Sequence, residues 1–327
     1  MSALLEVEDL VIRYPAMGRM RATLKGQRRD FDAVAGVSFA IEAGETLGLV
    51  GESGSGKSTV ARTLMGLKRA DAGRIRFDGR DITGASTADY AQLRREIAMM
   101  WQDPVGSLSP RLTVGSLVTE PLRIHGKRAD MAAEAKRLLE MVGLPQDFAG
   151  RFPHQLSGGQ ARRVGVARAL ALDPRLIIAD EPTAGLDMSV QAEVLNLLAE
   201  MQGRLGIAIL VITHNLNVVR HITDRMAIMY LGRFVEIGPT ERIFRAPRHP
   251  YTEALLSANP EPDPDAAHAR ITLEGEMPSP RQRPSGCEFH GRCPRAQPLC
   301  TEAAPEVSEP APGHAFTCHF PVGKAEA

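Results

Sequence analysis

Residues 51–59 form the string GESGSGKST, and this feature most narrows what the chain can fold into. The spacing G-x-x-x-x-G-K-[ST] is that of a phosphate-binding loop, which needs a buried strand before it and a helix after it. Both flanks agree, because residues 46–50 (TLGLV) suit a buried strand and a helical pattern begins at Val60. The string therefore predicts an α/β fold in which strand, loop and helix form one phosphate site.

The residue types in this loop match the chemistry of a nucleoside triphosphate. Glycine lets backbone N–H groups turn inward around phosphate oxygens, and the following helix presents the positive end of its dipole to the same anion. Lys57 would reach the β and γ phosphates, and the Ser58 hydroxyl would ligate Mg²⁺. We therefore expect ATP and Mg²⁺ as ligands. The predicted ATP-binding residues of the loop are Gly51, Glu52, Ser53, Gly54, Ser55, Gly56, Lys57, Ser58 and Thr59.

An acidic pair follows a second apolar run. Residues 176–179 (LIIA) suit a central parallel strand, and Asp180 and Glu181 come directly after them. At a strand tip beside a phosphate loop, Asp180 would hold Mg²⁺ and Glu181 would polarise an attacking water as general base. The alternative is a strand that ends in a solvated acidic pair. The phosphate loop in the same chain favours the catalytic interpretation.

Two further polar residues follow apolar runs. His214 comes after residues 208–213 (AILVIT), at the edge where a parallel sheet gathers its active-site groups. A lone histidine there is usually structural, but here it could contact the γ phosphate and sense hydrolysis. Gln102, in the string MMWQDP, would reach the metal and the attacking water. We therefore predict Glu181, His214 and Gln102 as catalytic residues, with Mg²⁺ held through Ser58, Gln102 and Asp180.

A second anion cradle occurs at residues 156–160, LSGGQ. Ser157 can cap the helix predicted over residues 161–172, and the glycines expose N–H groups at its positive end. A plain helix cap is the alternative. With one acidic strand end for two cradles, either the chain binds two nucleotides or each cradle is half of a site completed by another chain. The second hypothesis explains both cradles with one set of catalytic acids.

Composition restricts the class of protein. The formal net charge is +0, which lacks the basic excess of a dedicated nucleic-acid binder. No run approaches 18 consecutive apolar residues, so we do not expect the chain itself to span a membrane. The start, MSALLEVEDL, lacks the basic and apolar regions of a secretory signal, which favours a cytoplasmic location.

Periodicity places the remaining elements. Alternation predicts strands over residues 4–14, 34–41 and 73–77 and a hairpin over 226–237 that turns at 231–233, and helical spacing predicts helices over 131–142 and 189–205. Residues 15–30 are basic and are predicted as an exposed loop. From residue 239 the chain becomes rich in proline, and residues 260–284 are predicted as a linker with little core.

The strings GESGSGKST, WQDP, LSGGQ, LIIADEP, GLD and THN occur in this order, and the set resembles the nucleotide-binding subunits of ABC transporters. Within that family, four strings are similar to the ATPases of oligopeptide and dipeptide importers: GETLGLVGESGSGKSTVARTLMGL, QDPVGSLSPR, DMSVQAEVLNLL and RHPYTEALLSANP. QDPVGSLSPR is most similar to the second of the two paired ATPases in such importers. The resemblance implies a P-loop NTPase with a RecA-like parallel-sheet core, an antiparallel β subdomain and a helical signature subdomain at about 103–165. The ATPase domain would span residues 1–240 and a C-terminal extension residues 241–327.

The resemblance also implies a head-to-tail dimer. The loop around Lys57 would face the other subunit's signature across ATP, and in this chain the signature is Ser157, Gly158, Gly159 and Gln160. Tyr14 would stack on adenine, with Phe31 as a rival. Gln102 would link the γ phosphate to the segment that touches the membrane partner. Asp187 would lie in the loop that communicates with the opposite site.

The implied partners are a second ATPase, giving a heterodimer, two transmembrane permease subunits and an extracytoplasmic solute-binding protein, with no nucleic acid. The chain would be peripheral on the cytoplasmic face of the membrane and would energise import of peptides or a related small solute. Departures from the family pattern are Ser109, Ala161, Gly185 and Asn215; Gly185 loosens the loop before Asp187. A rival hypothesis is a soluble ABC ATPase that acts on DNA or ribosomes. Translation-type members usually carry two cassettes in one chain, and DNA-repair members insert a long coiled coil, whereas this sequence shows one cassette and no sustained heptad run. A P-loop kinase is weaker still, because LSGGQ has no place in kinase chemistry.

The four cysteines, Cys287, Cys293, Cys300 and Cys318, all lie near the C-terminus with spacing C-x5-C-x6-C-x17-C. Four thiolates suit a [4Fe–4S] cluster or tetrahedral zinc, although zinc sites favour closer cysteine pairs. Unligated thiols are the third option, and His290 and His319 could substitute as ligands. The segment resembles the C-terminal region of the importer ATPases, some of which hold an iron–sulfur cluster. Nothing in the sequence places it near the phosphate loop, so we expect a structural role.

Overall fold

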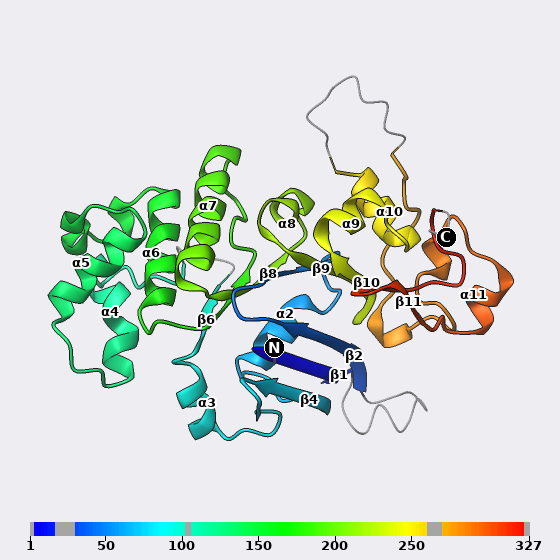
Figure 1. The fold of residues 1–327 in the computed structure, drawn as a ribbon, viewed down its shortest axis with the longest axis horizontal. Helices are drawn as coiled ribbons and strands as arrows, with labels where there is room; N and C mark the ends of the chain where they lie inside the picture. Colours follow the sequence, from blue (N-terminus) through cyan, green and yellow to red (C-terminus); the bar gives the residue numbers. More distant parts are fainter. Residues whose placement is uncertain (1–2, 17–29, 102–105, 260–269, 324–327) are drawn as a thin grey trace. The chain divides into compact units, whose positions relative to one another are not determined.

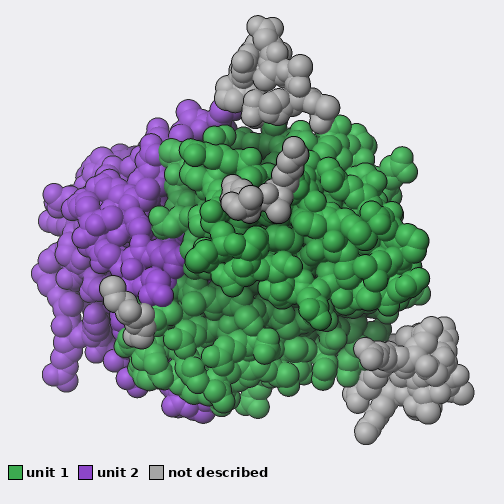
Figure 2. Space-filling view, turned by 45° about the vertical axis from the view of Figure 1, so that its right-hand side comes forward, with its two compact units in different colours: residues 1–41, 47–84, 213–327 green, residues 42–46, 85–212 purple. Residues whose placement is uncertain are grey.

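The computed structural model describes residues 3–16, 30–101, 106–259 and 270–323. The chain divides into two compact units, coloured separately in Figure 2. Unit 1 comprises residues 1–41, 47–84 and 213–327, and unit 2 comprises residues 42–46 and 85–212. Gln102 and most of the predicted basic loop lie outside the described residues.

Unit 1 contains a four-stranded antiparallel sheet in the order β2-β1-β4-β5. Its strands are β1 (Leu5–Pro15), β2 (Asp30–Ile41), β4 (Ala72–Phe77) and β5 (Arg80–Asp81). These confirm the strands predicted over 4–14 and 73–77. Strand β2 begins before the predicted Val34, because Phe31 pairs with Tyr14 across the sheet and extends the alternation.

The second sheet segment of unit 1 has the order β11-β12-β10-β9-β3. Strand β3 (Thr46–Val50) is parallel to β9 (Arg225–Tyr230), and β9 forms the predicted hairpin with β10 (Arg233–Pro239). Strands β12 (His314–Thr317) and β11 (Val307–Ala311) continue the sheet, with Glu236 opposite Phe316. The C-terminal extension therefore adds two strands to the sheet that contains β3.

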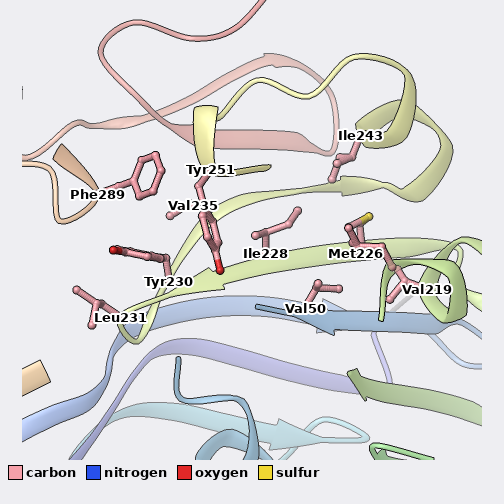
Figure 3. Close-up of a cluster of buried hydrophobic side chains, with 11 residues drawn as sticks. Val50, Val219, Met226, Ile228, Tyr230, Leu231, Val235, Ile243, Tyr251 and Phe289 are labelled. Atoms are coloured by element: carbon pink, nitrogen blue, oxygen red, sulfur yellow. The ribbon is translucent and has the colours of Figure 1, made fainter. Parts of the chain in front are cut away.

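The extension is also held by buried side chains. Tyr230, Tyr251 and Phe289 pack together with ring centroids 4.9–5.4 Å apart, from β9, α10 (Pro250–Ser257) and the segment before His290 (Figure 3). Glu236 is 1% exposed, and its carboxylate accepts hydrogen bonds from the backbone N–H groups of Arg248 and His249. It also lies 2.8 Å from Nε2 of His314. One buried acid thus connects β10, the start of α10 and β12.

Besides α10, the described part of unit 1 contains four short helices that lie near its strands (Figure 1). They are α2 (Lys57–Leu64), α8 (Leu216–Ile222), α9 (Thr240–Arg245) and α11 (Pro298–Glu302), with short 3₁₀ turns at Pro280–Gln282 and His290–Arg292. Leu273 and Met277, in the predicted linker, pack against the buried cluster of Figure 3. The described part of that segment therefore contributes to the core, contrary to the prediction.

Unit 2 contains parallel strands in the order β8-β7-β6 and a group of mutually packed helices. The strands are β6 (Ile97–Met100), β7 (Leu176–Asp180) and β8 (Ala208–Thr213). The helices are α3 (Thr87–Leu93), α4 (Val114–Ile124), α5 (Met131–Met141), α6 (Gly158–Leu170) and α7 (Met188–Leu205), with 3₁₀ turns at Gln146–Gly150 and Pro153–Gln155. Helix α6 begins at Gly158 rather than Ala161, because the signature glycines form its first turn. The predicted strands 176–180 and 208–213 and helices 131–142 and 189–205 are confirmed.

Among the described residues, none of the helices combines the length and the apolar character that a membrane crossing requires.

Candidate functional site

The phosphate loop lies between β3 and α2 of unit 1. All of β3 is buried, and the loop leaves it at Gly51. Lys57, 7% exposed, begins α2 and directs its Nζ into the loop, donating to the carbonyls of Gly51 at 2.7 Å and Glu52 at 2.9 Å. No side chain caps α2, and its first turn carries no acidic residue. A lysine and a helix N-terminus thus converge on one loop, which suits an oxyanion.

The glycines at both ends of the loop are required by packing. A Cβ on Gly51 would lie 2.2 Å from the Met229 carbonyl oxygen. Gly56 has a φ of +112°, and a Cβ there would lie 2.5 Å from the Ala33 carbonyl oxygen. Strands β9 and β2 thus approach the loop so closely that no side chain fits at either position.

The two rival adenine-stacking residues lie side by side. Tyr14 is the last residue but one of β1 and faces Phe31 in β2, with ring centroids 6.2 Å apart and planes inclined by 26°. Lys68 Nζ lies 4.8 Å from the Tyr14 ring centre, and the Arg281 guanidinium lies 5.5 Å from that of Phe31. The structure therefore brings both aromatic candidates to one edge of the antiparallel sheet, where a cationic side chain lies over each ring.

The acidic pair closes β7 in unit 2. Asp180 is its last residue and is 7% exposed. Glu181 has a φ of 49°, and its N–H donates to the Ile212 carbonyl at 2.8 Å. A left-handed backbone is uncommon for glutamate and costs on the order of 1 kcal/mol. The bond to β8 holds this turn at the sheet edge, where Glu181 is half-buried. His214 follows β8, is exposed and belongs to unit 1.

The signature segment forms the start of α6, also in unit 2. Ser157 caps the helix, accepting from the Gln160 N–H at 3.3 Å, and Gln160 Oε1 accepts from the Ser157 N–H at 3.0 Å. Arg162, which the sequence analysis did not single out, is buried and donates to the carbonyls of Pro182 and Ala184. The signature helix is thereby attached to the segment that follows Glu181.

Asp187 caps α7 at the end of that segment. Its carboxylate accepts from the Ser189 and Val190 N–H groups, both at 3.1 Å, and from the Ser189 hydroxyl at 2.6 Å. These bonds, the hydroxyl first among them, lower the pKa of Asp187. Gly159 of the signature has no room for a Cβ, which would lie 2.7 Å from the Val190 side chain. Within unit 2, the signature and the Asp187 loop are therefore in direct contact.

The sequence relatives agree with this arrangement. The ABC transporter family profile matches residues 34–184, and the profile of the oligopeptide/dipeptide transporter C-terminal region matches residues 235–300. The oligopeptide transport ATP-binding protein AppF of Bacillus subtilis is 45% identical over 322 residues, covering 97% of each chain. This chain belongs to the ATP-binding proteins of the oligopeptide/dipeptide ABC transporter family. It is an ABC ATPase.

Two further similarities support the assignment. The "Probable peptide ABC transporter ATP-binding protein y4tS" of Sinorhizobium fredii is 47% identical over 331 residues, covering 99% of this chain and 92% of its own. A solved structure, the dimeric ATP-binding cassette MJ0796 bound to ADP and phosphate, has a TM-score of 0.63 and 29% identity. It covers 72% of this chain and 98% of its own. The shared fold is thus that of an ABC cassette.

The extension of this ABC ATPase contacts the phosphate loop, contrary to the expectation from the sequence. Arg292 Nη1 donates to both carboxylate oxygens of Glu52, at 3.0 and 3.2 Å. The Tyr251 hydroxyl accepts from the Glu52 backbone N–H at 3.1 Å. Sequence reasoning missed both contacts, because more than 190 positions separate each partner from Glu52.

The four thiols lie in the same extension and influence one another. Burial, with smaller contributions from neighbouring thiols, raises the pKa of Cys287 and Cys293, and that of Cys318 to about 11. Backbone N–H groups of Phe289, Arg295 and Phe320 donate to these sulfurs, in the same order. Such a donor set, four thiols with N–H groups directed at the sulfurs, fits the chemistry of an iron–sulfur cluster.

The described side chains do not form a ready-made site for a metal ion. No three His, Cys, Asp or Glu side chains within the described ranges are grouped so that they could hold one ion. His290 and His319 instead pair with the backbone carbonyls of Cys287 and Ala303, at 2.8 and 2.9 Å. Each contact involves one ring nitrogen, and a ligating histidine commonly directs its second ring nitrogen at such a carbonyl, so both histidines stay open as substitute ligands.

Proposed function

We propose that this chain hydrolyses ATP to energise peptide import from the cytoplasmic face of the membrane. The observation that carries the proposal is the combination of an ABC cassette with an extension of the oligopeptide/dipeptide type, matched over residues 235–300. Relatives that cover almost the whole chain are named for peptide transport. We assign residues 1–240 to the ATPase domain and residues 241–327 to the extension.

In this proposal two ATPase chains sandwich ATP. The loop around Lys57 binds the phosphates, and the partner's signature completes the site; Ser157, Gly158, Gly159 and Gln160 of this chain serve the partner's nucleotide. The likeness to a dimeric cassette supports this arrangement. Both aromatic residues at the adenine edge, Tyr14 and Phe31, remain candidates for base stacking.

Hydrolysis follows from the charges that the site would assemble. Ser58, Asp180 and Gln102 would hold Mg²⁺, which would supply positive charge beside Lys57 for the transferring phosphoryl group. Glu181 polarises the attacking water, and His214 contacts the γ phosphate. Asp187 passes the state of one site to the other. Closure of the dimer moves two permease subunits, which receive solute from an extracytoplasmic binding protein.

The test of the catalytic assignment is Glu181→Gln in the purified transporter. Removing the general base should lower the ATPase rate by roughly 100-fold or more while ATP still binds. Glu193→Gln is the matched control, because Glu193 is an exposed α7 carboxylate that pairs with Arg163. An unchanged turnover rate in Glu181→Gln would remove this residue from the base role.

The role in peptide import is tested by whether a peptide-loaded binding protein stimulates ATP hydrolysis by the complex. ATP turnover of the complex should rise when a peptide-loaded binding protein is added, and not when the empty binding protein is added. Copurification with nucleic acid or ribosomes, without permease subunits, would instead favour the soluble ABC ATPase class.

We further propose that Cys287, Cys293, Cys300 and Cys318 hold a [4Fe–4S] cluster that stabilises the extension. The N–H groups directed at the sulfurs support this, and zinc is the alternative. Anaerobically purified protein should contain about four iron and four sulfide per chain, and Cys300→Ser should lose most of both. Stoichiometric zinc without iron would contradict the cluster.

A further inference from the structure

Glu52, the second residue of the phosphate loop, is held by three separate groups. Its carboxylate receives Arg292, its N–H donates to the Tyr251 hydroxyl, and its carbonyl accepts from Lys57 at 2.9 Å. Two of the three groups belong to the C-terminal extension. The Gly51–Glu52 peptide, whose N–H contacts the extension, also accepts from Lys57 at 2.7 Å through the Gly51 carbonyl.

The ion pair at Glu52 is well shielded on one side. The Arg292 side chain is 9% exposed, whereas that of Glu52 is 31% exposed. The Arg292 guanidinium also lies 6.0 Å from the Tyr230 ring centre. Tyr230 and Tyr251 are buried in the cluster of Figure 3. Close packing there holds the Tyr251 ring, which contacts Glu52, and the Tyr230 ring, which lies beside Arg292.

We propose that the extension sets the phosphate-binding geometry of the loop through Glu52, with Arg292 and Tyr251 as positioning residues for ATP. Arg292 neutralises a carboxylate that would otherwise oppose a polyanion bound in the same loop. Tyr251 fixes the orientation of the Gly51–Glu52 peptide, and through the Gly51 carbonyl the position of Lys57. The extension then contributes to ATP binding as well as to the sheet.

The experiment measures ATP affinity of the full-length chain by displacement of a fluorescent ATP analogue. Arg292→Gln should weaken ATP binding about fivefold, because the Glu52 carboxylate is left unpaired. In the Glu52→Gln background the same substitution should change affinity less than about twofold. Arg292→Lys, which keeps the charge, should recover most of the loss. Arg295→Gln, an exposed arginine of the same segment, is the control.

A purely structural role for Arg292 predicts a different result. The loss of ATP affinity would then be the same with and without the Glu52 carboxylate, and Arg292→Lys would not restore it. Either that outcome or wild-type affinity in Arg292→Gln overturns the proposal.

A second variant keeps the proposal testable if Arg292→Gln lowers the melting temperature of the chain. Tyr251→Phe retains the packed ring and removes only the hydroxyl that accepts from Glu52 N–H. It should weaken ATP binding about threefold at an unchanged melting temperature. Unchanged ATP affinity in a folded Tyr251→Phe chain would contradict the positioning role.

Discussion

At the scale of single residues, two glycines of the phosphate loop differ in what a methyl group would meet. Gly54 has a φ of +82° and open space around it, whereas Gly56 has a φ of +112° and a backbone oxygen 2.5 Å from any Cβ. Gly54→Ala should cost about 1 kcal/mol of unfolding free energy through backbone strain alone. Gly56→Ala should cost about 3 kcal/mol or more, because strand β2 must also move. Chemical denaturation of the two variants compares them directly, and equal losses would contradict this account.

At the scale of elements, the start of α10 depends on a neutral histidine. His249 caps the helix by accepting from the Tyr251 N–H at 3.0 Å through Nδ1, and burial lowers the pKa of His249 to about 3 from its usual 6.5. Between these two pH values, His249 is protonated in the unfolded chain but neutral in the folded chain. The contribution of His249 to the free energy of unfolding is therefore highest above pH 6.5 and falls as the pH is lowered.

The expected loss attributable to His249 is about 2 kcal/mol of unfolding free energy between about pH 7.5 and about pH 5. His249→Asn retains an oxygen that can cap α10 but carries no titrating group, so its stability should fall less over the same range. Denaturation of both chains at the two pH values measures the difference. Parallel stability curves for the two would show that His249 does not titrate in this way.

At the scale of the whole molecule, each of the two compact units carries its own share of the predicted nucleotide-binding elements. The phosphate loop belongs to unit 1, and the signature and acidic pair belong to unit 2.

In the purified transporter carrying Glu181→Gln, labelled ATP should be trapped in the closed dimer. Adding Ser157→Arg should release the label, because an arginine at the cap of α6 obstructs the facing subunit. Ala133→Arg, an exposed substitution on α5 of the same unit, is the control. Retention of the label with Ser157→Arg would contradict the composite site.

Much of the architecture could be predicted from local pattern. The strand β3, the loop 51–59, the cap at Ser157 and the strand that ends at Asp180 each carry a signature within a few residues. The physical reason is that a phosphate loop and a helix cap are built from neighbouring backbone groups, so their requirements are written in short strings.

Long-range contacts were decided only by the tertiary structure. The pairing of β12 with β10, the contacts of Arg162 with the segment after Glu181, and the hold of Arg292 on Glu52 join residues that are far apart in the chain. An arginine near the C-terminus is as compatible with a solvated surface as with an ion pair until folding places it. The sequence by itself thus determined the strand, loop and helix of the predicted phosphate site, and the fold decided that the C-terminal extension would hold that loop.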